Sequence, residues 1–309
     1  IQKDLDDGID TTGKKMTVCQ LYAKQIRHRG NVRYNTKNGR KRLMKLLEED
    51  KLVGCPIDSV KLSDAKEWAI RMKEKEISYK TISNDKRSLK AAFYTAIQDD
   101  CIRKNPFDFQ LNTVIEDDTE PKVPLTPAQE ESFLSFAQND KVYQKYYDEL
   151  IILLGTGLRI SELCGLTDTD IDFENRIINV DHQLLRSAET GYYIETPKTK
   201  SGIRQIPMSE KVYEAFNRVL KRSRGAKAVT IDGYSNFLFL NRDGYPKTAT
   251  NYDGMFRGLA KKYNKYHEEA LPKVMTPHTL RHTFCTNMAN AGMNPKALQY
   301  IMGHSNITM

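Results

Sequence analysis

The sequence has 309 residues, of which 28% are charged and 39% hydrophobic, and its formal net charge is +8. This length is enough for about two domains that each bury a core, and the composition is typical of a soluble globular protein. No apolar run approaches the roughly 20 residues of a membrane span, the first residues form no signal peptide, and five scattered cysteines without a C-x-x-C pair indicate reduced thiols in a cytosol.

The first part of the chain predicts a small all-α domain. Apolar residues recur there three or four positions apart, as on the buried face of a helix. Ser63 is expected to cap the third helix, with Glu67 near the third helical position. The expected helices cover residues 16–29, 39–50, 63–75 and 81–100.

Positive charge is concentrated in this part. Residues 1–112 hold 24 Lys+Arg against 16 Asp+Glu, and residues 11–47 hold eleven basic residues and no acidic one. A surface of one sign attracts polyanions such as nucleic acid. The alternative is an ordinary solvated face, because basic runs are common.

A segment without helical or strand periodicity follows. Residues 113–125 combine acidic residues and prolines and predict a linker between two domains. Thr126 and Pro127 then predict the start of a helix. The apolar run over 146–166 predicts a buried helix pair around two glycines.

Short segments of alternating polarity come next, and helices resume from Ser209 to the end. The alternation predicts strands over 176–180, 191–197 and 203–208. The last two flank KTKSG, residues 198–202, which we interpret as the tip of a hairpin that carries two lysines.

Histidine and arginine gather at the start of a late helix. Thr276 is expected to cap it and Pro277 to occupy its first position, which places His278 in the first turn. His278 and Arg281 are then about 60° apart and share one face. Positive side chains at a helix N-terminus are unfavourable unless an anion binds there. The sequence therefore predicts an anion site.

Further candidates are weak when each is taken singly. Arg159 lies in an apolar setting, where its guanidinium must meet a carboxylate such as Glu162 or a bound anion. The two lysines alone indicate solvated charges, and His304, after a glycine, indicates a capping or core residue. Together these groups indicate phosphate chemistry, since arginine grips phosphate oxygens, histidine moves protons and lysine can protonate a leaving oxygen. The sequence has no G-x-x-x-x-G-K-[ST] loop and no evident acidic cluster for two metal ions, which favours metal-free phosphoryl transfer.

Three motifs carry a resemblance to a known family. GTGLRISEL with Arg159, HTLRH with His278 and Arg281, and GH with His304 resemble, in this order, the signature of tyrosine recombinases. Within that family, TPKTKSGIRQIP and TPHTLRHTFCTNMANAGMNPKALQYIMGHSNITM most resemble integrases of conjugative transposons from Gram-positive bacteria.

The resemblance implies a fold that is mainly α with a small β-sheet. A helical core-binding domain and an α+β catalytic domain would form a clamp around DNA. The implied parts are a residual N-terminal linker (1–15), a SAM-like helical core-binding DNA-binding domain (16–112), an interdomain linker (113–125) and the catalytic domain (126–309).

The resemblance also implies a reaction. Such enzymes cut each strand by the attack of a tyrosine, which leaves a 3′-phosphotyrosine link, and then rejoin strands without cofactor or metal. Arg159 and Arg281 would hold the scissile phosphate, with His278 in proton transfer. His304 would donate a hydrogen bond to the phosphate. Lys200 would protonate the 5′-hydroxyl leaving group, with Lys198 as its competitor.

The nucleophilic tyrosine of the family falls past Met309, where this sequence ends, and Tyr300 is interpreted as helix packing. We therefore expect this chain to bind DNA without completing cleavage. The implied partners are double-stranded DNA at transposon ends and target sites, other integrase subunits in a tetramer, and an accessory excision factor. The implied location is the bacterial cytoplasm, with no membrane partner.

DNA contacts are expected along the basic N-terminal segment, on a face of the fourth helix and near the lysine-bearing turn. Most would be phosphate contacts, which position a protein without specifying sequence. The residues expected to make them are Arg27, Arg29, Arg33, Lys80, Thr81, Asn84, Lys86, Arg87, Lys198 and Arg204.

Two other functions are compatible with these residues. One is a non-catalytic DNA-binding protein that keeps the fold. The other is a zinc hydrolase, because His278 and His282 have the four-residue spacing that places two ligands on one helix face. Thr279 stands where such a hydrolase has its glutamate, which disfavours the zinc site.

Overall fold

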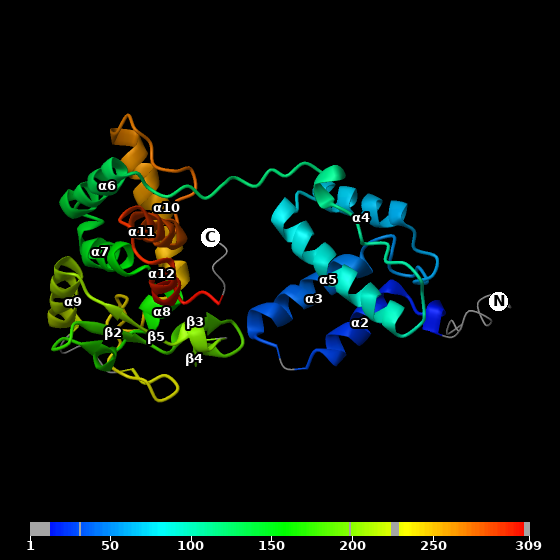
Figure 1. The fold of residues 1–309 in the computed structure, drawn as a ribbon, viewed down its shortest axis with the longest axis horizontal. Helices are drawn as coiled ribbons and strands as arrows, with labels where there is room; N and C mark the ends of the chain where they lie inside the picture. Colours follow the sequence, from blue (N-terminus) through cyan, green and yellow to red (C-terminus); the bar gives the residue numbers. More distant parts are fainter. Residues whose placement is uncertain (1–12, 31, 198, 224–228, 306–309) are drawn as a thin grey trace. The chain divides into compact units, whose positions relative to one another are not determined.

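The computed structural model describes residues 13–30, 32–197, 199–223 and 229–305. The chain divides into two compact units between Pro121 and Lys122, and the units are considered one at a time. Among the residues that the structure describes, no helix is both long enough and apolar enough to cross a membrane. Figure 1 labels the main helices and strands of both units.

The first unit is all helical, as its sequence predicts. Helix α2 packs against α3 and α5, and α4 packs against α5. Each of the four expected helices is present, although α3 begins earlier than its apolar pattern indicates. The elements are η1 (Gly13–Lys15), α2 (Val18–His28), α3 (Tyr34–Glu48), α4 (Leu62–Glu74), α5 (Tyr79–Gln98) and η2 (Leu111–Thr113).

The predicted cap of α4 is wrong by two positions. The residue before the first turn is Lys61, and its backbone N–H donates to the Asp64 carboxylate at 2.8 Å. The carboxylate of Asp64 therefore has the role that was expected of Glu67, because it accepts from the backbone N–H of the residue before the first turn. An acidic side chain in the first turn also meets the positive end of the helix dipole favourably.

Aromatic rings form the centre of the first core. Trp68 is fully buried, and the ring of Phe107 meets it edge-on with centroids 5.6 Å apart. Leu111 and Ile115 are buried in the same core. The packed part of this unit therefore continues past residue 112, where the linker was expected to begin.

The second unit combines helices with two small antiparallel sheets. Thr126 and Thr276 precede Pro127 and Pro277 at the starts of α6 and α11, as predicted. The helices are α6 (Pro127–Asn139), α7 (Tyr147–Thr156), α8 (Ile160–Gly165), α9 (Glu210–Ser223), α10 (Ala249–Tyr266), α11 (Pro277–Asn290) and α12 (Pro295–Met302), with 3₁₀ turns η3 (Gln144–Tyr146), η4 (Asp168–Asp170) and η5 (Lys200–Gly202). The strands are β1 (Ile171–Asp172), β2 (Ile177–Val180), β3 (Gln183–Ser187), β4 (Gly191–Glu195) and β5 (Arg204–Pro207).

The strand pairing corrects the predicted hairpin. β4 pairs with β3, whereas β5 pairs with β2 in a three-stranded sheet of order β1-β2-β5. β4 and β5 therefore belong to different sheets, and Lys200 lies in the short turn η5 of the segment between them. Alternating polarity shows which side of a strand is buried, but it does not name the partner strand.

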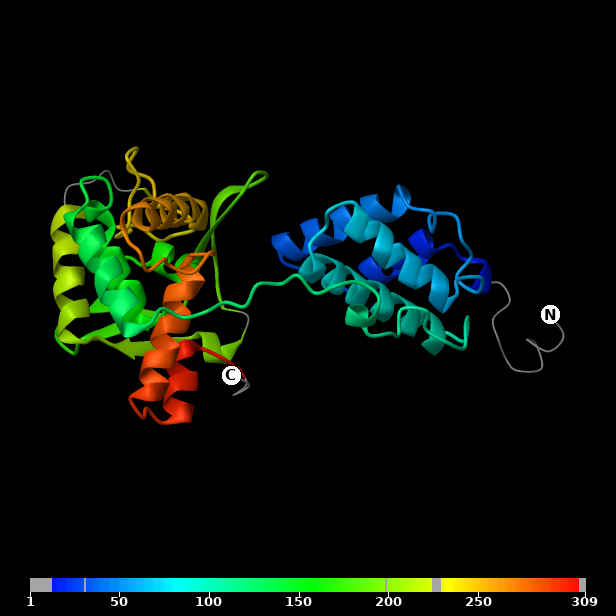
Figure 2. The ribbon, with the colours of Figure 1, turned by 90° about the horizontal axis from the view of Figure 1, so that it is seen from above.

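Helix α7 forms the centre of the second unit. Leu150 and Leu153 of α7 are fully buried, and both α9 and α11 pack on this helix. A side chain at Gly155 would collide with Val212 of α9, so the close approach of these helices requires glycine. In Figure 2, α11 (orange) and α12 (red) lie side by side. This packing brings the ends of α7 and α12 to the same region.

The first core offers a specific test of packing, because Trp68 is the single tryptophan of the sequence. Phe107→Ala should destabilise the first unit by about 3–5 kcal/mol, since it removes a buried ring from the core. Urea unfolding followed by Trp68 fluorescence reports this loss for the first unit alone. Val53→Ala, at an exposed site of the same unit, should change stability by less than about 0.5 kcal/mol. Equal effects of the two substitutions would contradict the described core.

Candidate active site

Arg159 is positioned by the break between α7 and α8. Gly157 ends α7 in the left-handed region with a φ of 63°, and a side chain there would collide with Phe284 of α11. Leu158 is buried, and Arg159 occupies the position just before the first turn of α8. This tight turn anchors the backbone, while the Arg159 side chain remains 31% exposed.

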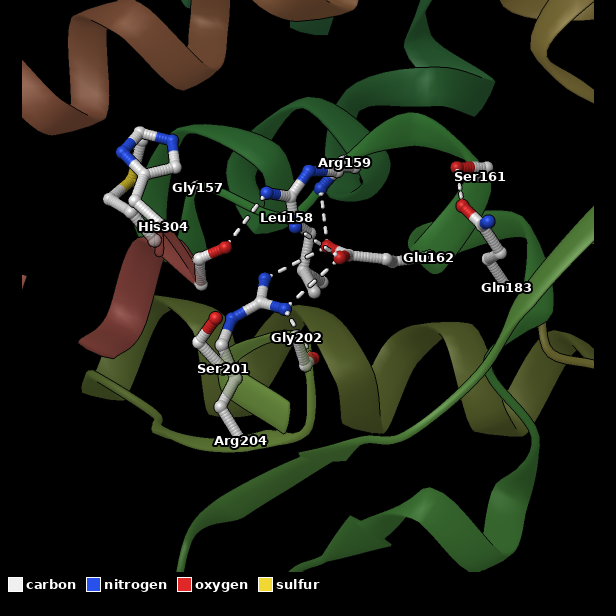
Figure 3. Close-up of polar contacts among 12 residues, drawn as sticks. Gly157, Leu158, Arg159, Ser161, Glu162, Gln183, Ser201, Gly202, Arg204 and His304 are labelled. Atoms are coloured by element: carbon white, nitrogen blue, oxygen red, sulfur yellow. Dashed lines mark hydrogen bonds and ion pairs between the residues drawn. The ribbon is translucent and has the colours of Figure 1, made fainter. Parts of the chain in front are cut away.

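The Glu162 carboxylate lies between two guanidinium groups (Figure 3). Arg159 donates from Nη1 to Glu162 Oε1 at 2.7 Å and from its backbone N–H to Oε2 at 2.8 Å. Arg204 donates from Nη1 and Nη2 to the same two oxygens at 3.0 and 2.8 Å. Burial opposes ionisation of Glu162, but the hydrogen bonds and charges of the two arginines outweigh it and hold its pKa below the usual range. The pairing of Arg159 with Glu162 is thus confirmed.

Arg281 brings a third guanidinium to the site from α11. It is only 5% exposed and donates to the backbone oxygens of Gly157 and Met302. No carboxylate of the described residues forms an ion pair with it. Burial, followed by the positive charge of Arg159, lowers its pKa to about 10. A cation held this deeply without an acidic partner favours the arrival of an anion.

His304 lies directly beside Arg281. It follows Gly303, which ends α12 in the left-handed region with a φ of 61°. Arg281 Nη2 is 3.1 Å from His304 Nε2, and because arginine has only donors, Nε2 accepts and the ring proton lies on Nδ1. Burial and the positive charges of Arg281 and Arg159 lower the pKa of His304. The end of α12 also accepts a bond from Arg159, whose Nη2 donates to the Gly303 oxygen at 3.0 Å.

His278 and His282 extend the same cationic region along α11. Partial desolvation of its ring, followed by the charges of Lys122 and Arg281, lowers the pKa of His278. The same causes lower the pKa of His282. Lys122 was not among the predicted site residues. Its position in the segment expected as a linker gave no signal that it lies near these rings.

The site therefore has more positive charge than its protein groups neutralise. Three guanidinium groups meet one buried carboxylate, and lowered histidine pKa values show that further positive charge is disfavoured there. A phosphate diester fits this region, since it supplies negative charge and several acceptor oxygens. The arrangement can stabilise charge that develops on phosphorus oxygens during displacement.

Metal-ligating groups cluster elsewhere. Within the described ranges, the group close enough to hold a metal consists of Asp170, Asp181 and His182. The ring of His182 instead contacts the Gly165 backbone oxygen at 2.8 Å and the Asp181 carboxylate at 2.6 Å. His278 and His282 do not belong to that cluster, so the described geometry gives no support to a zinc hydrolase.

The predicted DNA contact at Arg204 is wrong. Its side chain is fully buried and its donors are directed to Glu162 and to backbone oxygens, so the guanidinium cannot lie on a DNA-facing surface. Lys200 is exposed on η5, and this turn is joined to the site through the bond from Arg204 Nη1 to Gly202 O at 3.2 Å. Lys198 lies outside the described residues.

The candidate DNA contacts of the first unit lie mainly at its surface. Arg27 and Arg29 at the end of α2 are exposed, and Arg33 just before α3 is half-buried. On α5 the side chains at 80, 84 and 87 share one face, because they recur four and three residues apart; they are Lys80, Asn84 and Arg87.

Two other candidates on α5, Lys86 and Thr81, do not belong to this face. Lys86 lies about 120° away from Lys80 around the helix. Its ammonium packs over the ring of Phe109 at 4.5 Å from the centroid, so it covers the protein core. Thr81 is half-buried, and its backbone N–H donates to the cap Ser78. Neither feature marks these two residues as open DNA contacts.

Comparison with known proteins adds a family and a fold. Residues 124–309 match the model of the phage integrase family. The chain is 67% identical over its whole length to the transposase from transposon Tn916 of Enterococcus faecalis and spans 76% of that relative. It is 77% identical to the Tn1549 transposon integrase in complex with a circular intermediate DNA, with a TM-score of 0.92, covering 95% of this chain and 93% of that one.

A more distant structure supports the fold alone. The lambda integrase dimer bound to a COC′ core site is 15% identical, with a TM-score of 0.63, covering 94% of this chain and 95% of that one. The mainly helical fold with small antiparallel sheets is therefore confirmed.

The lowered histidine pKa values predict how DNA affinity depends on pH. The pKa of His278 lies below its ordinary 6.5 in the free protein, so the ring is neutral at pH 7, and a phosphate nearby should raise this pKa. DNA binding should then take up protons and tighten as pH falls from 7 to 5.5. Uptake of one proton tightens binding by at most about tenfold for each pH unit. Fluorescence anisotropy at constant ionic strength measures this.

Two comparisons make this test specific. His278→Asn should flatten the pH dependence, leaving the part that comes from His282 and His304. Potassium chloride at matched ionic strength should not change the NMR titration of the His278 ring, whereas a short duplex should. Weaker binding at low pH would contradict a phosphate site beside this ring.

Proposed function

The chain belongs to the phage integrase family of tyrosine recombinases, and on that premise we propose that it is the integrase of a conjugative transposon. It would cut and rejoin DNA strands through a 3′-phosphotyrosine intermediate and so excise and integrate a mobile element. The observation that carries this proposal is the cationic site, in which the guanidinium groups of Arg159 and Arg281 and the imidazole of His304 meet. The similarity to the Tn1549 integrase supports the same class of DNA as substrate.

Arg159 and Arg281 have different roles in the proposed reaction. Arg159 is the more open of the two and contacts one phosphate oxygen, while Arg281 acts from the buried side. Both stabilise the charge that the phosphorus oxygens gain as the tyrosine oxygen attacks and the 5′-oxygen leaves. His304, whose ring proton lies on Nδ1, donates from that nitrogen to a phosphate oxygen.

His278 serves as a neutral proton carrier. Its lowered pKa leaves a ring nitrogen able to accept the tyrosine proton near pH 7. The same proton returns to the tyrosine oxygen when the strands are rejoined. Neither direction needs an external energy source, because the phosphotyrosine bond preserves the energy of the broken diester.

A lysine on the β4–β5 segment protonates the leaving 5′-oxygen. Lys200 is exposed on η5, a turn that Arg204 binds to the rest of the site. Lys198 is two residues away in sequence and stays its competitor. Protonation by either residue would let the 5′-strand leave as a hydroxyl group.

DNA would be contacted by both units. In the first unit, Arg27, Arg29 and the α5 face of Lys80, Asn84 and Arg87 are open to a phosphate backbone. Contacts of this kind set register and supply most of the affinity. We further propose that subunits assemble as a tetramer on paired transposon ends, with an accessory factor for excision.

Arg159→Ala tests the reaction itself. In the protein expressed from its intact reading frame, a nicked suicide substrate should trap a covalent protein–DNA adduct. Loss of one charge-stabilising donor should slow adduct formation by about 10²–10³-fold. Denaturing gel electrophoresis measures the adduct, and a mobility shift measures DNA binding, which should change far less.

The control for this test is Arg242→Ala, an exposed arginine in the loop before α10, which should leave adduct formation unchanged. A non-catalytic DNA-binding protein on the same fold would form no adduct with any variant. That result would refute the recombinase.

A modified substrate identifies the general acid. If the bridging 5′-oxygen is replaced by sulfur, the leaving thiolate needs no proton, so loss of the acid becomes harmless. Lys200→Ala should cut the normal diester at least about 10²-fold more slowly and the sulfur substrate at the unmodified protein's rate. Lys198→Ala is the matched variant. If rescue by sulfur is seen with Lys198→Ala alone, the role belongs to Lys198.

A further inference from the structure

We infer that Arg204 is a positioning residue for strand cleavage, which holds three separate segments of the active site in one geometry. This inference rests on the proposed function. Arg204 itself touches no DNA, because its side chain is fully buried. Its effect on the reaction passes through the groups that it binds.

Four hydrogen bonds connect Arg204 to three segments. The guanidinium grips Glu162 with two donors, at 3.0 and 2.8 Å, and Glu162 in turn holds Arg159. Its Nε donates to the Ile301 oxygen near the end of α12 at 2.6 Å. Its Nη1 also donates to the Gly202 oxygen of η5 at 3.2 Å. Figure 3 shows Arg204 directed at Glu162 beside Ser201 and Gly202.

Each of these segments carries a group of the proposed reaction. Glu162 positions Arg159, which holds the phosphate. The end of α12 leads directly into His304. η5 carries Lys200, and Lys198 precedes it in the same connection between β4 and β5. The guanidinium group of arginine has several donors fixed in one plane, so it can hold three segments at set positions relative to one another. The single ammonium charge of a lysine cannot do this.

Gly303 shows how closely the segments meet. A Cβ there would lie 3.1 Å from both Arg204 Nη1 and the backbone oxygen of Ser201. The turn that carries His304 therefore packs against both the turn that carries Lys200 and the Arg204 guanidinium. A small displacement of Arg204 would move both turns relative to Arg159.

A stability role alone explains this arrangement poorly. A buried ion pair adds little net stability, because removing both charges from water costs nearly as much as their attraction returns. One bidentate bond to Glu162 would satisfy that carboxylate, yet Arg204 also binds two backbone oxygens on other segments. The additional bonds serve alignment of those segments.

The experiment compares Arg204→Lys with the unmodified protein, both from the intact reading frame, on the normal diester and on the 5′-bridging sulfur substrate. Lysine keeps the charge but loses the fork. Cleavage of the normal diester should fall by about 10²-fold, the cost of misplacing reacting groups by about 1 Å. The defect should shrink by at least about tenfold on the sulfur substrate, because a misplaced lysine no longer matters there.

The control variant is Arg176→Lys. Arg176 lies just before β2 and forms an exposed ion pair with Glu210, which lysine can keep, so this variant should cleave both substrates normally. DNA binding and thermal unfolding verify that each variant is folded. The inference is overturned if folded Arg204→Lys cleaves the normal diester as fast as the unmodified protein. It is also overturned if cleavage of both substrates is slowed equally. If the unmodified protein forms no adduct, it is the proposed recombinase that fails.

A second variant covers the case in which Arg204→Lys does not fold. The added methyl group of Gly303→Ala would push against Arg204 Nη1 and the Ser201 backbone oxygen. This variant therefore disturbs the same contact and leaves every buried charge in place. It should show the same slow cleavage and the same partial recovery on the sulfur substrate. An equal defect on both substrates in folded Gly303→Ala would then reject the positioning role.

Discussion

The active site depends on one shared carboxylate. Glu162 is buried and accepts from both Arg159 and Arg204, so a single negative charge fixes two guanidinium groups whose mutual repulsion would otherwise separate them. Arg281 adds a third, held by backbone oxygens. The protein thus holds a concentrated positive field in a desolvated region, and under the proposed function a phosphate would complement the charge that remains.

The fold brings these groups together from chain segments that are far apart in sequence. The end of α7, the turn η5 and the end of α12 each contribute backbone that lies against an arginine. Left-handed glycines at Gly157 and Gly303 permit the close approach. Strain or crowding at either turn would therefore disturb chemistry as well as packing.

Much of this was predictable from the sequence, and the failures have physical causes. Apolar periodicity and the Thr-Pro starts located most helices, because these signals are local. The prediction that β4 and β5 form a hairpin was wrong, since alternating polarity does not identify a strand's partner. Arg204 was misassigned because a basic side chain is usually exposed, and only the tertiary position of Glu162 explains its burial. Lys122 was missed, since closeness to His278 depends on how the chain enters the second unit.

Most acceptors that hold the arginines are main-chain oxygens, those of Gly157, Gly202, Ile301, Met302 and Gly303. A carbonyl group is the same in every amino acid, so drift at positions such as 301 and 302 leaves the polar framework intact so long as the apolar volume is kept. The side chains at positions 301 and 302 can therefore change without altering these hydrogen bonds, whereas no other side chain reproduces the fixed donors of a guanidinium group.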